Sequence, residues 1–138
     1  MANILSATVF TTKDEHGNPH TEGWLTLEFG EAYQGPNGGI AFDLSRFKRI
    51  DYIQTAPISG CVLRAILSSA TPASGAFWNS GALVQVIPQV PDYNTPQSTR
   101  FQIWAPLNAI SGFGVTELTS APAAAVSGIR FTARVIGQ

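Results

Sequence analysis

Apolar and polar residues alternate with a period of two along several stretches of the chain. In residues 24–29 the apolar side is formed by Leu25, Leu27 and Phe29. The opposite side is formed by Trp24, Thr26 and Glu28. Such a period is typical of a β-strand that buries one face and exposes the other. We therefore predict a half-buried strand at this position.

Two later stretches alternate in the same way. In residues 99–105 the inward positions are Phe101, Ile103 and Ala105. In residues 128–137 they are Ile129, Phe131, Ala133 and Val135, with mostly arginines and threonines between them. Shorter alternation, or a high content of β-branched and aromatic residues, favours four more strands at residues 4–12, 61–67, 82–90 and 114–118.

The stretch 35–56 combines a turn, a corner and a strand. Gly38 and Gly39 can adopt positive φ without a steric penalty, so the chain can reverse sharply there. After a short apolar step, the Asp43 side chain can accept hydrogen bonds from the backbone amides just beyond it. We expect this aspartate to hold a single turn of helix, followed by a strand over residues 47–55.

These elements predict an all-β fold with about seven or eight strands. Helical periodicity never exceeds a turn or two, and residues 121–126, interrupted by Pro122, are the only candidate for a helix. Neither a repeat nor a linker divides residues 1–138. We therefore predict a single-domain antiparallel β-sandwich or jelly roll. The apolar start, residues 1–6, is predicted to be an N-terminal arm that adds to a neighbouring chain.

Charged residues make up only 12% of the chain and the net charge is -1, whereas ordinary globular domains contain about 25% charged residues. Neutral surfaces repel one another weakly, which favours assembly. The chain has no basic cluster, so we expect no nucleic-acid partner. It also lacks an apolar run of about 18 residues and the features of a signal peptide, so we expect neither a membrane span nor a leader.

Few residues suggest chemistry. His16 and His20 share an acidic loop that could hold a metal, but their spacing matches no established ligand pattern. Cys61 could be a nucleophile, although its alternation with leucines favours a buried small hydrophobe. Glu28 and Asp51 could form the acid pair of a glycoside hydrolase. None of these readings has a supporting motif, so we expect no enzyme, no metal and no cofactor.

The aromatic residues suggest an interface instead. Trp24 and Trp104 fall on the outward sides of their strands, unless a second sheet covers them. Phe77 and Trp78 lie within residues 68–81, a loop of small residues that offers little to bury them. Tryptophan is enriched at interface hot spots, so we predict an interface loop there. The candidate interface residues are Ile4, Leu5, Trp24, Phe77, Trp78 and Trp104.

One order of features resembles a known family. It consists of the strand TLEFG, a turn with Tyr33, Pro36, Gly38 and Gly39, the corner Asp43-Leu44, the strand start Asp51-Tyr52-Ile53, and a closing Arg134-Val135 with Gly137. Over residues 22–56 and 128–138 the chain resembles the small β-rich structural proteins of tailed-bacteriophage virions, the head decoration or cement proteins. The resemblance implies a non-enzymatic protein on the outer surface of the capsid. Such a protein reinforces contacts between major capsid protein subunits, commonly as a trimer.

Two other functions are compatible with the same pattern. A carbohydrate-binding or host-attachment β-sandwich would use exposed tryptophan and tyrosine rings as stacking platforms. A small hydrolase would need an acid or histidine with a perturbed pKa in a cleft.

Overall fold

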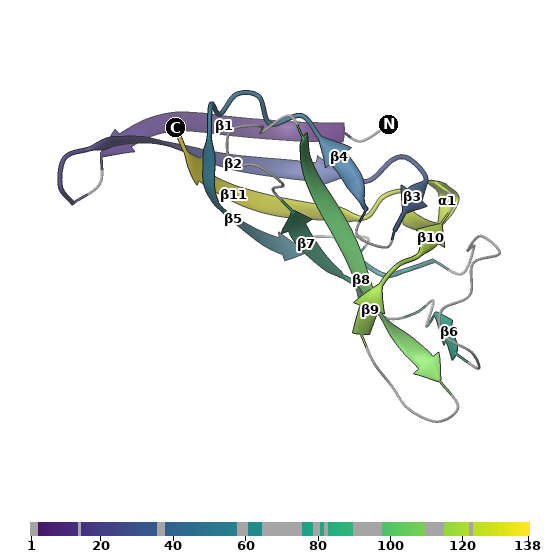
Figure 1. The fold of residues 1–138 in the computed structure, drawn as a ribbon. Helices are drawn as coiled ribbons and strands as arrows, with labels where there is room; N and C mark the ends of the chain where they lie inside the picture. Colours follow the sequence, from purple (N-terminus) through teal and green to yellow (C-terminus); the bar gives the residue numbers. More distant parts are fainter. Residues whose placement is uncertain are drawn as a thin grey trace.

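The computed structural model describes residues 3–13, 15–35, 38–57, 61–64, 76–78, 81, 83–89, 98–109, 115–121 and 123–138. Within these residues the fold is all-β, as predicted, and sandwich-like. Of the eleven described strands, five are only two or three residues long, so the sequence pattern revealed mainly the longer ones. Figure 1 shows one layer of long strands lying across a second, more twisted layer.

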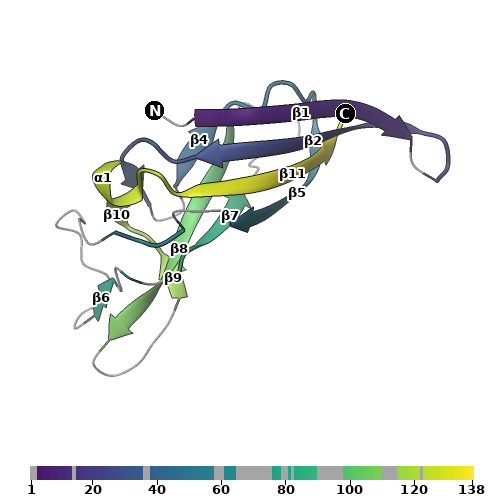
Figure 2. The same cartoon turned by 180° about the vertical axis from the view of Figure 1, so that it is seen from behind.

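The first layer is a four-stranded antiparallel sheet. Its strands are β1 (Asn3–Lys13), β2 (Pro19–Glu28), β11 (Arg130–Gly137) and β5 (Ile50–Pro57), in the order β1-β2-β11-β5. The last strand of the chain therefore lies at the centre of the sheet, between β2 and β5 (Figure 2). The first strand lies at one edge.

The second layer is built on one long strand, β8 (Thr99–Ala109). Four short strands pair with it: β4 (Ile40–Phe42), β6 (Ala76–Trp78), β7 (Gln85–Gln89) and β9 (Val115–Glu117). A small separate sheet joins β3 (Tyr33–Gln34) to β10 (Ser120–Ala121). The single helical turn, α1 (Ala123–Val126), lies within the segment predicted as the only helix candidate. No helix in the described part of the chain is long and apolar enough to span a membrane.

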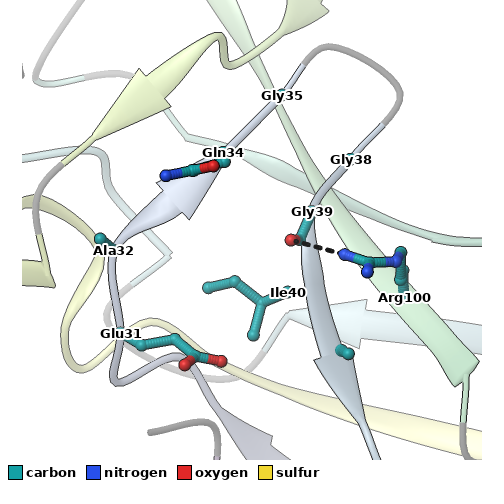
Figure 3. A pocket seen from close by; sticks show the side chains of 9 residues that line it. Glu31, Ala32, Gln34, Gly35, Gly38, Gly39, Ile40 and Arg100 are labelled. Atoms are coloured by element: carbon teal, nitrogen blue, oxygen red, sulfur yellow. Dashed lines mark hydrogen bonds between the residues drawn. The ribbon is translucent and has the colours of Figure 1, made fainter.

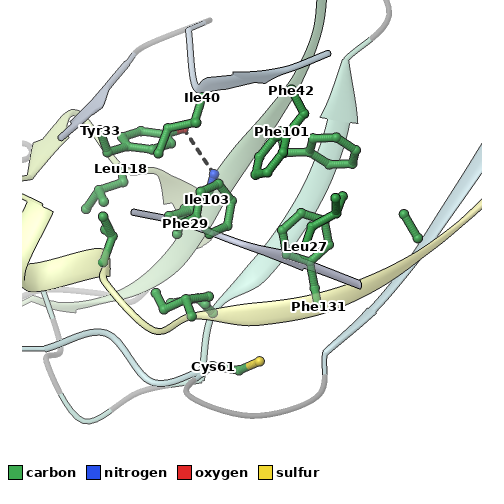
Figure 4. Close-up of a cluster of buried hydrophobic side chains, with 14 of the residues drawn as sticks. Leu27, Phe29, Tyr33, Ile40, Phe42, Cys61, Phe101, Ile103, Leu118 and Phe131 are labelled. Atoms are coloured by element: carbon green, nitrogen blue, oxygen red, sulfur yellow. Dashed lines mark hydrogen bonds between the residues drawn. The ribbon is translucent and has the colours of Figure 1, made fainter. Parts of the chain in front are cut away.

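Four phenylalanines join the two layers. Phe29 and Phe131 come from the first layer, and Phe42 and Phe101 from the second. The ring centroids of the contacting pairs lie 5.0 to 6.0 Å apart, mostly edge to face or tilted (Figure 4). Such pairs contribute roughly 0.5–1.5 kcal/mol each beyond the burial of their area. The inward positions predicted in residues 24–29, 99–105 and 128–137 are all buried around this cluster.

A buried hydrogen-bond network lies beside the phenylalanines. The Tyr33 hydroxyl donates to Glu117 Oε1 at 2.8 Å and accepts from the Ile103 amide at 3.0 Å. Burial, with a contribution from the Glu117 carboxylate, raises the pKa of Tyr33 well above its ordinary value. The phenol therefore remains protonated and keeps its role as a donor. One side chain thus connects β3, β8 and β9.

The predicted turn at Gly39 is confirmed, whereas the corner at Asp43 differs from the predicted single turn of helix. Gly39 has a φ of 110°, and a Cβ there would lie 2.6 Å from the Phe101 carbonyl oxygen, so only glycine fits. Asp43 Oδ1 accepts a hydrogen bond from the Ser45 amide at 2.9 Å. The corner is a tight turn closed by the Phe47 amide on the Leu44 carbonyl rather than a full turn of helix.

The N-terminal arm is not seen. Residues 3–6 are the start of β1 and pair with β2 of the same chain, from Asn3 opposite Glu28 onward. Residues 1–2 lie outside the described residues. A short hairpin connects β1 to β2, so pairing within the chain costs little loop entropy. One side of the segment is therefore paired within the chain, and the segment is part of an edge strand of the domain.

The Tyr33 network leads to a stability prediction. Tyr33→Phe removes the acceptor of a buried amide and the donor to Glu117, so it should lower the free energy of unfolding by about 1–3 kcal/mol. Urea denaturation followed by circular dichroism measures this change. The matched control is Tyr52→Phe, because Tyr52 is half exposed. Equal denaturation midpoints for the two variants would contradict a structural role of the network.

Candidate functional site

The solvent-facing side of the four-stranded sheet, here called the outer face, gathers the exposed aromatic residues of the described part of the chain. Strand register aligns its side chains in rows that cross β1, β2, β11 and β5. One row contains Phe10, Glu22, Ile136 and Tyr52. The next contains Thr8, Trp24, Arg134 and Gln54. A third contains Ser6, Thr26, Thr132 and Ala56.

Three aromatic side chains project from the first two rows. Phe10 is 42% exposed, and Trp24 and Tyr52 are each 50% exposed. From strand and residue spacing, the backbone positions of Phe10 and Trp24 are about 8 Å apart, and those of Trp24 and Tyr52 about 12 Å. Single exposed hydrophobic residues are ordinary, but three on one flat face form a patch of the kind that marks a binding surface.

An ion pair lies between the aromatic residues. Arg134 Nε is 2.6 Å from Glu22 Oε1, and the Arg134 guanidinium carbon is 5.4 Å from the centroid of the Trp24 ring. Glu22 is buried, although it lies on the solvent side of the sheet. At the end of the face, Arg130 and Glu28 form a second pair at 2.6 Å. These partly exposed pairs contribute little to stability, about 1 kcal/mol or less each, but they neutralise the face.

The alternation of β2 and β11 places these groups. Inward residues of both strands fill the core, so every second residue must point outward. The outward positions of β11 are Arg130, Thr132, Arg134 and Ile136, opposite Glu28, Thr26, Trp24 and Glu22 of β2. Arg130 is therefore directly opposite Glu28, whereas Arg134 reaches Glu22 diagonally, so opposite charges meet across the two strands.

The predicted interface residues have different positions. Trp24 is exposed on the outer face, as expected. Trp104 on β8 is half-buried, and its indole Nε1 donates to Gln102 Oε1 at 3.1 Å. Ile4 is 37% exposed at the sheet edge. The side chains of Leu5 and Phe77 lie outside the described residues.

Trp78 requires a correction. It is only 6% exposed and belongs to the core cluster, so it is not an exposed anchor of this chain. Of the predicted interface loop over residues 68–81, only residues 76–78 and 81 are described. Residues 76–78 form β6 and pair with the end of β8, which provides the burial that the local sequence did not reveal.

The sequence analysis did not predict Phe10, Tyr52, Glu22 or Arg134 as interface residues. Each of the four occupies an outward position in a predicted strand or just before one. The period-two alternation could therefore have shown that their side chains point away from the core. The missing information was the order of the strands, which brings residues 10, 24, 52 and 134 onto one face.

The residues considered for catalysis are not assembled into a catalytic site. Glu28 pairs with Arg130, and Asp51 with Arg49 at 2.9 Å. Glu28 is opposite Arg130, the first residue of β11. Asp51 is next to Ile50, which is opposite Gly137, the last residue of β11. The two acids are therefore about 20 Å apart, much further than the roughly 5–9.5 Å of glycosidase carboxylates.

The histidine and cysteine candidates have local partners. His20 Nε2 is hydrogen-bonded to Thr12 Oγ1 at 2.8 Å, and His16 lies 3.8 Å from Glu15. Among the residues that the structure describes, no three His, Cys, Asp or Glu side chains lie close enough to hold a metal. Cys61 is buried and its thiol donates to the Arg130 carbonyl at 3.1 Å, which confirms its prediction as a buried small residue.

Two open depressions mark the surface. The first, of about 640 Å³, lies between β3 and β4, and its lining includes three glycines together with Glu31, Gln34, Ile40 and Arg100 (Figure 3). The second, of about 1080 Å³, adjoins the outer face. Its lining includes Asn18, His20, Lys48, Asp51, Arg134 and Ile136. Arg134, which contacts Trp24, also lines this depression, so the aromatic patch borders it.

Comparison of the chain with protein-family models, with curated proteins and with solved structures finds no match.

The contrast between two tryptophans leads to a prediction. Trp78→Ala leaves a cavity in the core and should reduce the free energy of unfolding by about 3–5 kcal/mol. Trp24→Ala removes a half-exposed ring and its contact with Arg134, and should cost about 1 kcal/mol or less. Urea titration of both variants measures the two changes. A Trp78→Ala protein as stable as the Trp24→Ala protein would show that Trp78 is not a core residue.

Proposed function

We propose that this chain is a non-catalytic structural protein whose outer face binds another protein surface. More specifically, we propose a capsid decoration (cement) protein on the exterior of a tailed-phage head. The observation that carries the proposal is the outer face itself, where Phe10, Trp24 and Tyr52 are exposed around the neutralised pair of Glu22 and Arg134.

The composition of the outer face favours a protein partner. Interfaces concentrate aromatic and arginine residues at their centre, where unpaired charges are rare. Trp24 and Arg134 are of these types and already in contact. A partner that covers them would bury apolar area without stripping water from a lone charge. This reduces the desolvation penalty of binding.

The resemblance to decoration proteins involves the same strands. Its two stretches, residues 22–56 and 128–138, include most of β2 and β5 and all of β11. These are three of the four strands of the outer face. A relationship based on these stretches therefore bears on the surface that we propose as functional, and not only on the core.

The partner in this proposal is the major capsid protein. A homo-oligomer, with a trimer implied by the resemblance, would present several copies of one modest site to a repeating shell. Linked copies gain avidity without any single strong contact. The low charge of the chain is compatible with such assembly, because copies repel one another weakly.

Glycan binding by the same face is the second candidate. Trp24 and Tyr52 expose rings about 12 Å apart at the backbone, with Gln54 beside them. The adjoining depression supplies the polar side chains of Asn18 and Asp51. Sugar rings stack on aromatic faces while amides and carboxylates bind their hydroxyls. A binding role of either kind needs no acid–base pair, so catalysis is not included in the proposal.

Binding to particles tests the protein partner. In cosedimentation with capsids that lack the protein, Trp24→Ala and Tyr52→Ala should each weaken retention. The double variant should weaken it by roughly 30-fold or more, because the loss of about 2 kcal/mol of binding free energy at a hot spot corresponds to such a factor. The matched control is Leu83→Ala, because Leu83 is 72% exposed but lies outside the outer face.

Retention of the Trp24/Tyr52 double variant at the level of the control would contradict the proposed surface. A glycan array separates the two candidates. Binding of the isolated protein to defined glycans, lost in Trp24→Ala, together with no cosedimentation, would replace the capsid role with glycan recognition.

The neutral face also predicts how salt affects binding. Exposed charges are screened within about 8 Å at physiological ionic strength, whereas apolar burial is not weakened by salt. Retention on capsids should therefore change little between low salt and about 1 M NaCl. Release by moderate salt would show that ion pairs hold the protein on the shell. Equal heat resistance of particles with and without the protein would remove the cement role.

A further inference from the structure

Strand β1 has one open edge. It pairs with β2 along one side, and the strand order β1-β2-β11-β5 leaves its other side without a partner in the described part of the chain. At eleven residues it is as long as β8 and longer than the other described strands. The backbone amides and carbonyls that point away from β2 are therefore available for further hydrogen bonds.

The usual protections of an edge strand are missing from most of β1. Natural edges carry charged residues, prolines or bulges that prevent pairing. In β1 the register irregularity falls between Ile4 and Ser6, and the only charge is Lys13 at the end. Between them, residues 6–12 (SATVFTT) are uncharged, contain no proline and pair regularly with β2.

The opposite edge of the same sheet differs. Strand β7 lies beside β5, and the Thr55 hydroxyl donates to the Val86 carbonyl at 2.6 Å. The second layer therefore covers part of the β5 edge, so head-to-tail pairing of β1 with β5 of another copy is disfavoured. This leaves β1 with itself as the pairing that identical chains can form freely.

We propose that β1 pairs antiparallel with β1 of a second copy, about a two-fold axis at Val9. This axis joins two four-stranded sheets into one continuous eight-stranded sheet. Val9 is the midpoint of the unprotected segment, so all seven of its residues find a partner. The pairs are Val9 with Val9, Thr8 with Phe10, Ala7 with Thr11, and Ser6 with Thr12.

The proposed register satisfies both faces of the sheet. Paired residues have the same parity, so outward positions meet outward positions and inward positions meet inward ones. Like charges do not oppose each other, since the segment has none, and Lys13 falls outside it. A Thr–aromatic neighbour pair such as Thr8 with Phe10 is favourable in sheets. Seven paired residues provide roughly six to eight backbone hydrogen bonds.

The pairing would have a consequence for the outer face. The two-fold axis is perpendicular to the sheet, so both outer faces point the same way, and both copies of Phe10 and Trp24 lie near the seam. The aromatic patch is thereby doubled and made continuous. The inference does not depend on the identity of the bound partner, and it adds a two-fold contact to any threefold assembly.

Sedimentation velocity of the full chain, from micromolar to submillimolar concentration, tests the contact. We expect a reversible species of twice the monomer mass. Thr8→Lys places two charges at the seam and should weaken dimerisation at least tenfold. The matched control is Ala56→Lys, which adds the same charge. Ala56 is exposed on the outer face of β5, at the edge of the sheet opposite β1. It should dimerise as the unmodified chain does.

A mixing experiment tests the register. In the proposed pairing, Thr8 of one copy lies opposite Phe10 of the other. Each variant alone should dimerise poorly. Thr8→Lys brings two like charges to the seam, and Phe10→Glu does the same and also removes the aromatic ring. Mixed together, they should recover dimers through a lysine–glutamate pair. Failure to recover would overturn the axis at Val9.

Hydrogen exchange of the unmodified chain supplies a readout that requires no variant. Amides in residues 6–12 should become more protected as concentration rises, while amides of the central strand β11 should not change. A monomer with unchanged exchange throughout the concentration range would overturn the proposal. So would a dimer or trimer that Thr8→Lys leaves intact. Protection of β1 only on capsids would assign the edge to the shell protein and not to a second copy.

Discussion

The contact between the two layers, made by Phe29, Phe42, Phe101 and Phe131, is the interaction on which the rest of the structure depends. These rings come from β-strands or strand ends far apart in the sequence and meet at 5.0 to 6.0 Å. Once they bury one face of the four-stranded sheet, strand alternation forces the remaining side chains of β1, β2, β5 and β11 outward. The positions that form the outer face are therefore fixed by those that form the core.

The outer face differs from an ordinary solvated surface in that its charged side chains are paired with each other. Its charged residues in β2 and β11 are paired across the two strands, as Glu22 with Arg134 and Glu28 with Arg130. Its other positions are uncharged, and they include threonines and half-exposed aromatic rings. A partner would meet a surface whose charges are already compensated. Burial of aromatic area would then dominate its binding, which connects the low charge of the chain to a role in assembly.

The edge of the sheet and its face have different physical requirements. The face can remain solvated as a single copy, because its polar groups are paired. The open side of β1 displays backbone groups that water satisfies but that another strand satisfies equally well. Pairing within the chain explains why residues 3–6 are not an arm, and the same pairing leaves an uncharged edge exposed. Pairing with β2 fixes β1 as an extended strand, and its other side is thereby able to pair with a further strand.

The sequence by itself determined the all-β class, the inward faces of three strands and the turn at Gly39 with its Asp43 corner. These depend on period-two burial and local hydrogen bonds, which a single segment encodes. The order β1-β2-β11-β5 could not be predicted, because strand pairing joins residues about a hundred positions apart. That order alone brings Phe10, Trp24 and Tyr52 onto one face and places Arg134 diagonally across from Glu22. Likewise, only the tertiary structure shows that Trp78 is buried in the core, on a short strand that pairs with β8. Local patterns specify which side of a strand faces the core, whereas tertiary pairing decides which neighbours that side and its opposite acquire.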